Sequence, residues 1–296
     1  RSSLEMQTRI AQSYNRFVPH ELIALLERKG ILEVLPGDQV MTEFTVLFAD
    51  VRGFTAIAEQ LPPALTFYFI NEYLRHVQPA VDQNGGIINQ FLGDGIMALF
   101  PKDADAAVAG AVAMFAGVRA YNAGREATLP EIRIGVGMNT GMLALGTRGV
   151  PERLDCGVVG DPVNIASRVE GLTKPYGAPL VISETTYLAM KYPERFAIRE
   201  LDLVVPVGRK QPLRIYEVID AEFGAMRDGK LATLERFRAA RDALTAGRFE
   251  EALSGFSACV TAFPADSAAS LLVQRCAQLR EDGATGWDGA YRPKVK

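Results

Sequence analysis

Two stretches, Thr45–Thr55 (TVLFADVRGFT) and Ile87–Phe100 (IINQFLGDGIMALF), decide how the chain folds. Each contains a strand-length run of β-branched, aliphatic and aromatic residues, and each carries one carboxylate, Asp50 or Asp94. The second stretch predicts a hairpin, because glycines flank Asp94 at its turn. A lone aspartate most often caps a strand or a turn. Two of them, each close to the end of an apolar strand, favour a site for a hard divalent cation such as Mg²⁺ or Mn²⁺.

The segments FADVRGFT and FLGDGIMALF resemble the two metal-binding segments of class III adenylyl and guanylyl cyclases of bacterial type. A third segment, Val158–Glu170 (VVGDPVNIASRVE), is similar to the third signature of that family, and the similarity runs from about Phe44 to Val218. The resemblance implies an α+β fold with a ferredoxin-like βαββαβ core, of the kind found in polymerase palms. It also implies a lyase that converts a nucleoside triphosphate to a 3′,5′-cyclic nucleotide and pyrophosphate in intracellular signalling.

The resemblance assigns roles to residues of the first two segments. Asp50 and Asp94 are expected to bridge two Mg²⁺ or Mn²⁺ ions, and the Val51 carbonyl to supply a further oxygen. Such ions lower the pKa of the attacking ribose hydroxyl and neutralise charge on the phosphates. Arg52 is expected to be structural. The next turn, beside a helix N-terminus, is predicted to contact the substrate phosphates through backbone N–H groups; its residues are Gly53, Phe54 and Thr55.

The third segment supplies the expected transition-state groups. Asn164 and Arg168 are four residues apart, so they project from one face of a helix. In the family the asparagine orients the ribose and the arginine stabilises charge on the reacting phosphate, and Arg133 matches a position that binds the β- or γ-phosphate. The family takes the acids and the Asn–Arg pair from opposite subunits. The resemblance therefore implies a head-to-tail homodimer with two equivalent sites.

The sequence departs from the family pattern at two places. The first, at the positions that contact the base, leaves the identity of the nucleotide open. Gln90 stands where adenylyl cyclases have a base-contacting lysine, and Gly157 stands where its partner is threonine or aspartate. A glutamine amide both donates and accepts, so it does not select one purine. ATP is the first expectation, GTP the second, and other nucleoside triphosphates stay open. The second departure is Val207, in place of a triphosphate-binding lysine; Arg209 or Lys210 can substitute for it.

The bulk composition indicates a globular protein and excludes several other classes. The chain has 296 residues, 48% hydrophobic and 23% charged, with a net charge of −3. This charge gives no footprint for nucleic-acid binding. No apolar run of the roughly 20 residues of a membrane helix appears. The first residue is Arg1, so we interpret the chain as a cytoplasmic catalytic fragment, and membrane anchoring of its parent stays open. Three scattered cysteines argue against structural zinc.

Apolar periodicity predicts an amphipathic helix over residues 4–17 and a single helix over 56–84. A strand over 132–139 is expected to end at a turn formed by Thr140-Gly141, with further strands at 142–146 and 158–159.

Shifts in composition predict four regions. Residues 1–43 are expected to form a helical segment that couples an upstream sensor domain to the catalytic domain, 44–220. Residues 221–281 form a helical region with one tetratricopeptide-like unit, and 282–296 a tail pinned by the single tryptophan, Trp287. A helical hairpin docked on the catalytic domain is favoured over a partner-binding array, because one repeat cannot build a solenoid.

Two alternatives to an active cyclase stay open. A non-catalytic, nucleotide-binding regulatory module is motivated by Gln90, Gly157 and Val207, and an interaction scaffold by the C-terminal helices. The filled metal and transition-state positions favour the enzyme over both.

Overall fold

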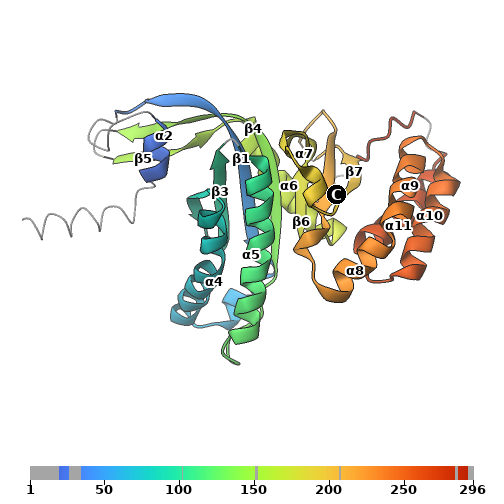
Figure 1. Ribbon diagram of the computed structural model, residues 1–296, viewed down its shortest axis with the longest axis horizontal. Coiled ribbons are helices and arrows are strands. Elements are labelled where there is room, and N and C mark those ends of the chain that lie inside the picture. Colours follow the sequence, from blue (N-terminus) through green and yellow to red (C-terminus); the bar gives the residue numbers. More distant parts are fainter. Residues whose placement is uncertain are drawn as a thin grey trace, which may run out of the picture.

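The computed structural model describes residues 20–26, 35–101, 103–150, 153–206, 208–283 and 286–292. These residues form an eight-stranded sheet in the order β2-β3-β1-β4-β6-β8-β7, with β5 paired to β4 (Figure 1). Within it, β4 and β6 are parallel and the other pairs antiparallel. The strands are β1 (Gln39–Val51), β2 (Ile87–Leu92), β3 (Gly95–Pro101), β4 (Ile134–Val150), β5 (Arg153–Val159), β6 (Leu180–Ser183), β7 (Ile198–Val204) and β8 (Leu213–Val218).

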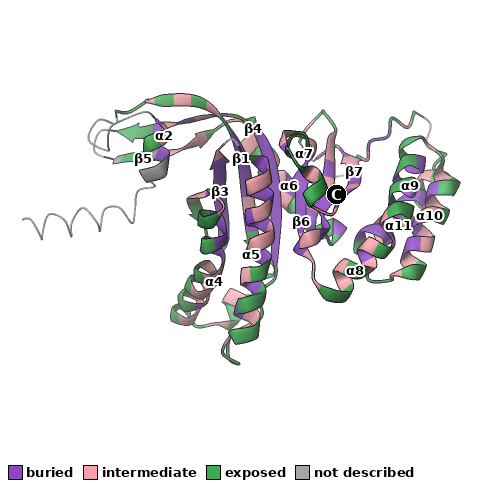
Figure 2. Ribbon diagram, viewed as in Figure 1, coloured by how far each residue is buried: buried purple, intermediate pink, exposed green. Residues whose placement is uncertain are grey.

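The first half of the chain has the predicted βαββαβ core. Its strands β1 to β4 lie in the order β2-β3-β1-β4, and its two crossover helices cover one face of the sheet (Figure 1). These helices are α4 (Pro63–Gln83) and α5 (Ala104–Gly124). By length and composition alone α5 could cross a membrane, but half of its apolar window is buried, against α4 and the sheet (Figure 2). The prediction of an α+β, ferredoxin-like fold is confirmed.

One predicted helix is two in the structure. We expected a single helix over 56–84, but α3 (Phe54–Gln60) ends before α4 begins. The break lies at Leu61, whose φ of −102° and ψ of 141° are extended. Pro62 and Pro63 explain it, because a residue that precedes proline is driven out of the helical region. Pro63 then occupies the first turn of α4, where a missing N–H costs nothing.

The prediction of a turn at Thr140-Gly141 was wrong. β4 runs without interruption for 17 residues, and it pairs with β1 through Phe44↔Gly141 and Thr45↔Thr140. β4 then continues into a hairpin with β5, which is also longer than predicted. Glycine after threonine suggests a turn by composition, but here the glycine is needed inside the strand to admit a helix.

That helix is α6 (Asp161–Tyr176), which lies directly on β4, on the sheet face opposite α4 and α5. A Cβ atom on Gly137 would lie 2.0 Å from the backbone nitrogen of Glu170, and one on Gly141 2.8 Å from Pro162 Cγ. Gly135 makes room for the Arg52 guanidinium, 1.9 Å from such a Cβ atom, and for Thr173 Oγ1 at 2.6 Å. Residues 135, 137 and 141 share one face of the strand because side chains alternate along it. We call these three residues the glycine track.

Of the N-terminal segment 1–43, the structure describes α2 (His20–Leu25), Leu26 and residues 35–43. Leu22 and Leu26 are buried in the apolar cluster that contains Phe44, Val46 and Leu143. Residues 39–43, which we expected to precede the sheet, already belong to β1. The predicted helix over residues 4–17 lies outside the described residues.

The C-terminal region consists of four helices, shown in orange to red at one end of the molecule in Figure 1. Three of them, α9 to α11, share an apolar cluster with α6, β6, β7 and β8, so the helices are docked on the catalytic sheet, as the favoured alternative predicted. Trp287 holds the tail by donating from Nε1 to the Leu244 carbonyl at 2.9 Å. The helices are α8 (Gly224–Ala232), α9 (Leu234–Thr245), α10 (Phe249–Ala262) and α11 (Ser267–Glu281).

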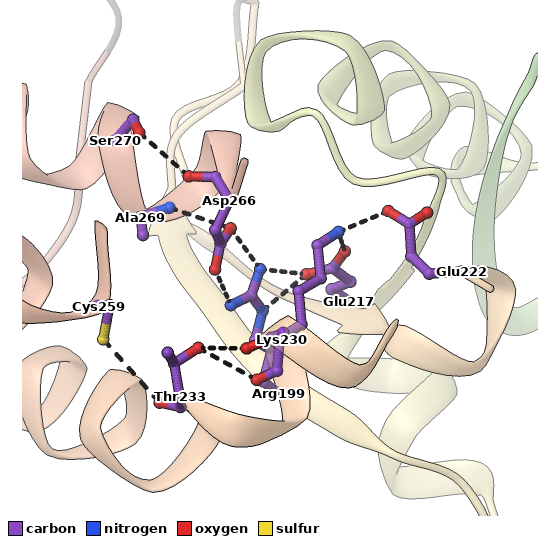
Figure 3. A network of polar contacts seen from close by, with 10 residues as sticks. Arg199, Glu217, Glu222, Lys230, Thr233, Cys259, Asp266, Ala269 and Ser270 are labelled. Atoms are coloured by element: carbon purple, nitrogen blue, oxygen red, sulfur yellow. Dashed lines mark hydrogen bonds and ion pairs between the residues drawn. The ribbon is translucent and has the colours of Figure 1, made fainter. Parts of the chain in front are cut away.

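Buried ion pairs connect these helices to the sheet. Arg199 of β7 donates to Glu217 of β8 at 2.7 Å and pairs with Asp266, the N-cap of α11, at 2.6 Å (Figure 3). Lys230 of α8 pairs with Glu217 at 2.6 Å. The side chains of Arg199, Glu217 and Asp266 are 0% exposed. Arg199 and Glu217 pair with each other within the sheet, whereas Asp266 and Lys230 reach them only while the helices stay docked.

A second buried contact reaches the end of α6. Arg275 of α11 pairs with Asp202 of β7 and donates to the hydroxyl of Tyr176 at 3.3 Å. Tyr176, the last residue of α6, also donates to Asp202. The C-terminal helices thus hold one end of α6, and the glycine track underlies the rest of it.

We predict that Gly137→Ala destabilises the fold, because the new methyl group meets helix backbone that cannot rotate away. Overpacking of this kind costs about 1–3 kcal/mol. Gly171→Ala, on the exposed side of α6, is the matched control; a Cβ there meets nothing within 4 Å, so this change is expected to be neutral or to stabilise by about 0.5–1 kcal/mol. Thermal unfolding of both variants is the measurement. Equal melting temperatures would contradict the close contact.

Arg199→Met is expected to destabilise the protein by about 3–5 kcal/mol, because it leaves two buried carboxylates with one cation. Arg280→Met on α11 removes an exposed ion pair with Glu250 and is expected to cost less than about 1 kcal/mol. Urea unfolding followed by circular dichroism compares the two. A small loss for Arg199→Met would mean that water enters the contact and the helices dock loosely.

Candidate active site

The fold brings the two predicted metal acids together. Asp50 is the penultimate residue of β1, and Asp94 lies in the turn between β2 and β3. Antiparallel pairing of β1 with β3 ends at Ala49↔Ile96, which places the turn beside Asp50. Asp94 Oδ2 accepts a hydrogen bond from the Val51 N–H at 3.2 Å, and a Cβ atom on Gly95 would lie 3.5 Å from Asp50 Oδ1. The Asp50 carboxylate therefore lies beside the turn that contains Asp94.

The electrostatics of this pair favour a cation. Burial, a hydrogen bond to Asp50 and the charge of Asp50 together raise the pKa of Asp94 to about 6. Two carboxyl groups in contact need a proton or a cation between them. No cluster of three or more acidic, histidine or cysteine side chains suited to a metal occurs among the described residues. Two carboxylates and a carbonyl suit Mg²⁺, which keeps several waters and is completed by substrate phosphates.

Tyr73 of α4 is a site neighbour that the sequence reasoning missed. It is 1% exposed, and its hydroxyl has no hydrogen-bond partner among the described residues. Burial raises its pKa, and the charges of Asp50 and Asp94 raise it further, so the hydroxyl stays protonated. Its place in an apolar helix pattern gave no sign of this, because a buried tyrosine and a phenylalanine fit that pattern equally.

The turn after β1 opens towards a short helix. Gly53 has a φ of 71°, a left-handed conformation, and precedes α3, which begins at Phe54 and Thr55. Arg52 points away from the acids: it donates to Glu170 at 3.3 Å and to Thr173, both on α6. Arg52 thus connects the end of β1 to α6. Its backbone N–H donates to the Arg133 carbonyl at 2.7 Å, which places Arg133 at the same end of the sheet.

The transition-state candidates lie on α6, and the fold decides where they point. Ala166, Val169 and Thr173 are the buried side of the helix, which leaves Asn164 exposed and Arg168 half-buried. The Asn139 amide fixes the start of the helix by donating to the Pro162 carbonyl at 3.1 Å. Arg168 approaches the loop between β7 and β8, where a Cβ atom on Gly208 would lie 3.6 Å from Nη2.

The same loop contains the cations proposed to bind the triphosphate. Arg209 pairs with Asp161, the first residue of α6, at 2.8 Å, whereas Lys210 is exposed. Val207 lies outside the described residues. Arg209 therefore already has a carboxylate partner, and Lys210 is the better placed of the two to meet a phosphate.

A single chain does not assemble the whole predicted site. The acids lie where β1 meets β3, on one side of β4, whereas Arg168 reaches towards the β7–β8 loop, on the other side. α6, the helix that contains Arg168, lies against β4.

Gln90 and Gly157, the predicted base-contacting positions, flank a residue that the sequence reasoning did not single out. β2 has a bulge between Ile88 and Gln90, so Asn89 is an extra residue in the strand, and Gln90 is exposed. A Cβ atom on Gly157 would lie 4.0 Å from Asn89 Oδ1, an oxygen that is buried and has no hydrogen-bond partner among the described residues. A β-bulge cannot be recognised reliably in a single sequence. The sequence therefore indicated Gln90 as the base-contacting residue and gave no reason to consider Asn89.

Comparison with known proteins accords with this geometry. Residues 38–219 match the family model described as the adenylate and guanylate cyclase catalytic domain. The chain belongs to that family. The recognition of a cyclase-type catalytic domain from its three motifs is therefore confirmed.

Two curated proteins and one solved structure illustrate what this cyclase domain is similar to. An adenylate cyclase of Anabaena cylindrica is 38% identical over 213 residues, which are 70% of this chain and 42% of the relative. The terminal-differentiation specific adenylate cyclase of Dictyostelium discoideum is 33% identical over 270 residues, 89% of this chain and 13% of the relative. The crystal structure of the guanylyl cyclase Cya2 matches with a TM-score of 0.54 and 32% identity, over 62% of this chain and 94% of that one. The chain thus spans less than half of either curated relative.

We predict that Asp50→Asn and Asp94→Asn each weaken Mn²⁺ binding by more than about tenfold, since even residues that only orient metal ligands are worth about 10–100-fold. Mn²⁺ titration followed by electron paramagnetic resonance measures the affinity. Asp242→Asn, an exposed aspartate on α9, is the control and should bind as the unaltered protein does. Unchanged affinity in both site variants would remove these acids from the metal site.

Proposed function

We propose that this chain is a nucleotidyl cyclase that converts ATP to 3′,5′-cyclic AMP and pyrophosphate at a homodimer interface, in intracellular signalling. The observation that carries the proposal is the contact between Asp50 and Asp94 at the end of β1, in a member of the cyclase family. Asn164 and Arg168 on the outer side of α6 supply the second half of the site.

The reaction joins the ribose 3′-oxygen to the α-phosphorus and breaks the bond from that phosphorus to the bridging oxygen of pyrophosphate. The proton of the 3′-hydroxyl leaves to water. Two Mg²⁺ or Mn²⁺ ions held by Asp50, Asp94 and the Val51 carbonyl supply a lower hydroxyl pKa and neutralise phosphate charge. Asn164 orients the ribose, and Arg168 stabilises charge that develops on the phosphate, which is often the largest catalytic effect.

The positions of these groups support a homodimer. The acids and Arg168 lie on opposite sides of β4 within one chain, and in the proposed dimer a second copy brings its Arg168 to the acids. Apolar side chains on the exposed strands of the same half of the molecule support a covered surface; they are Phe91 (51% exposed), Leu92 (45%), Met142 (52%) and Val159 (64%).

ATP is the proposed nucleotide because both curated relatives described above are adenylate cyclases. GTP is the second candidate, since Cya2 is a guanylyl cyclase and the side chains at positions 89 and 90 are amides, which pair with either purine. At the other end of the nucleotide, Lys210 and Arg133 bind the terminal phosphates, and backbone N–H groups of residues 53–55 face them. A signal from an upstream sensor domain would enter through the segment before β1.

A non-catalytic, nucleotide-binding regulatory module is the second candidate function. The observation that favours it is Gly157, which offers no side chain to the base. A module of this kind would bind nucleotide and leave it unchanged.

Incubation with each nucleoside triphosphate and Mn²⁺, followed by mass spectrometry, separates the two functions. We expect a cyclic nucleotide, with ATP the best substrate. Arg168→Ala should lower kcat by about 10²–10³-fold, because a preorganised charge opposite the reacting phosphate is lost. Arg75→Ala, an arginine of α4 whose side chain is 74% exposed, should leave the rate unchanged. Nucleotide binding without any cyclic product would support the regulatory module instead.

Mixing the two inactive variants Asp50→Ala and Arg168→Ala tests the shared site. A mixed dimer contains one site with both its acids and its arginine intact, so we expect partial recovery of activity. The recovered rate should rise with protein concentration as mixed dimers form. No recovery, with dimers present by sedimentation, would contradict the division of the site between two chains.

A further inference from the structure

A cavity of about 670 Å³ is lined by none of the residues assigned to the nucleotide base or the metals, although Arg133, proposed to bind a terminal phosphate, and Arg52 are among its lining residues. It opens between the second half of α5, the start of β4, the connection from α6 to β6, and the segment that leads into α8 (Figure 1). Its size falls within the range of about 300–1,000 Å³ that small-molecule sites occupy. We call it the α5–α8 cavity.

One side of the α5–α8 cavity is apolar and firmly built. Phe115, Val118 and Ile134 are core residues that reach its wall, and Phe223 and Met226 close it from the α8 side. The polar part of the wall is fixed by Asn122, whose amide donates to the Ile132 carbonyl at 2.7 Å and accepts from the Ile132 N–H at 2.8 Å. The wall is therefore part of the folded core.

The other lining residues give the α5–α8 cavity a positive charge. Arg119, Arg133 and Lys174 line it, and among the described residues no carboxylate forms an ion pair with any of them. Arg119 is held over the ring of Phe223, with its Cζ atom 4.0 Å from the ring centroid. Glu222, the one acidic lining residue, is already paired with Lys230 at 2.6 Å. These three exposed cations, together with Arg52, which is paired with Glu170 at 3.3 Å, give the partly apolar cavity an excess of positive charge among the described residues.

We propose that the α5–α8 cavity is a second ligand site, for a small organic anion with an apolar body. A carboxylate, sulfonate or phosphate head meets Arg119 and Lys174, and a ring or short chain lies against Phe223 and Met226. The site is placed to influence the reaction, because the Arg133 carbonyl holds the N–H of Arg52, two residues after Asp50. This last consequence rests on the proposed function, whereas ligand binding does not.

The fluorescent anion 8-anilinonaphthalene-1-sulfonate tests the site without turnover. It has a sulfonate and an aromatic body, and its emission rises when the body leaves water. We expect saturable binding, at one probe per chain. The double variant Arg119→Glu, Lys174→Glu should bind about tenfold more weakly or worse, since hydrogen bonds to charged groups are lost and like charges replace them. Arg75→Glu, the same charge reversal on α4, is the matched control and should bind as before.

Two further measurements guard the interpretation. Met226→Trp narrows the cavity on its apolar side and leaves its charges unchanged, so it should also reduce binding. Circular dichroism checks that this variant folds. If it does not, the double variant decides the test. ATP in the presence of EDTA is the competitor, because Arg133 is also proposed to bind the nucleotide. Little displacement is expected. Full displacement by ATP, or unchanged probe binding in the double variant, would overturn the second site.

Discussion

The close contact between α6 and β4 is the constraint on which the candidate site depends. The helix backbone comes so near the strand that Gly137 has no space for a Cβ atom. Side chains normally keep a helix well clear of a sheet, and three glycines on one strand face remove that barrier here. As a result α6 has little freedom to rotate or shift on the sheet. The positions from which Asn164 and Arg168 project are therefore fixed. Catalytic groups gain most from such rigid support, since small misplacements are costly.

The acid pair depends on where two strands meet. The Asp50 carboxylate lies beside the turn that contains Asp94, and the Val51 N–H fixes the other carboxylate. Two acids in contact raise the free energy of the protein when both are ionised, and a divalent ion removes that repulsion. The unliganded fold therefore already holds both acids close together, and burial together with their charges raises the pKa of the Tyr73 hydroxyl.

Much of this could be predicted from the sequence, and the failures have physical causes. The strands that contain Asp50 and Asp94 were predictable because each is a short apolar run that ends in a turn signal. The core order of strands followed from the family resemblance. By contrast, Gly141 was interpreted as a turn because composition does not show whether a glycine frees the backbone or admits a neighbour. Asn89 and Tyr73 were missed because their importance comes from a bulge and from a contact between distant segments.

Family similarity covers residues 38–219, yet the helices that follow complete the same folding unit. Arg199 and Glu217 lie inside the matched range, but their cover and their partners Asp266 and Lys230 come from beyond it. A polypeptide cut at residue 219, where the match to the family model ends, would expose these charges and the apolar side of β7 and β8 to solvent. It would also release Tyr176, the terminus of the catalytic helix, from Arg275. The folded core of this chain thus extends beyond the residues that match the family model, and the C-terminal helices are part of its interior.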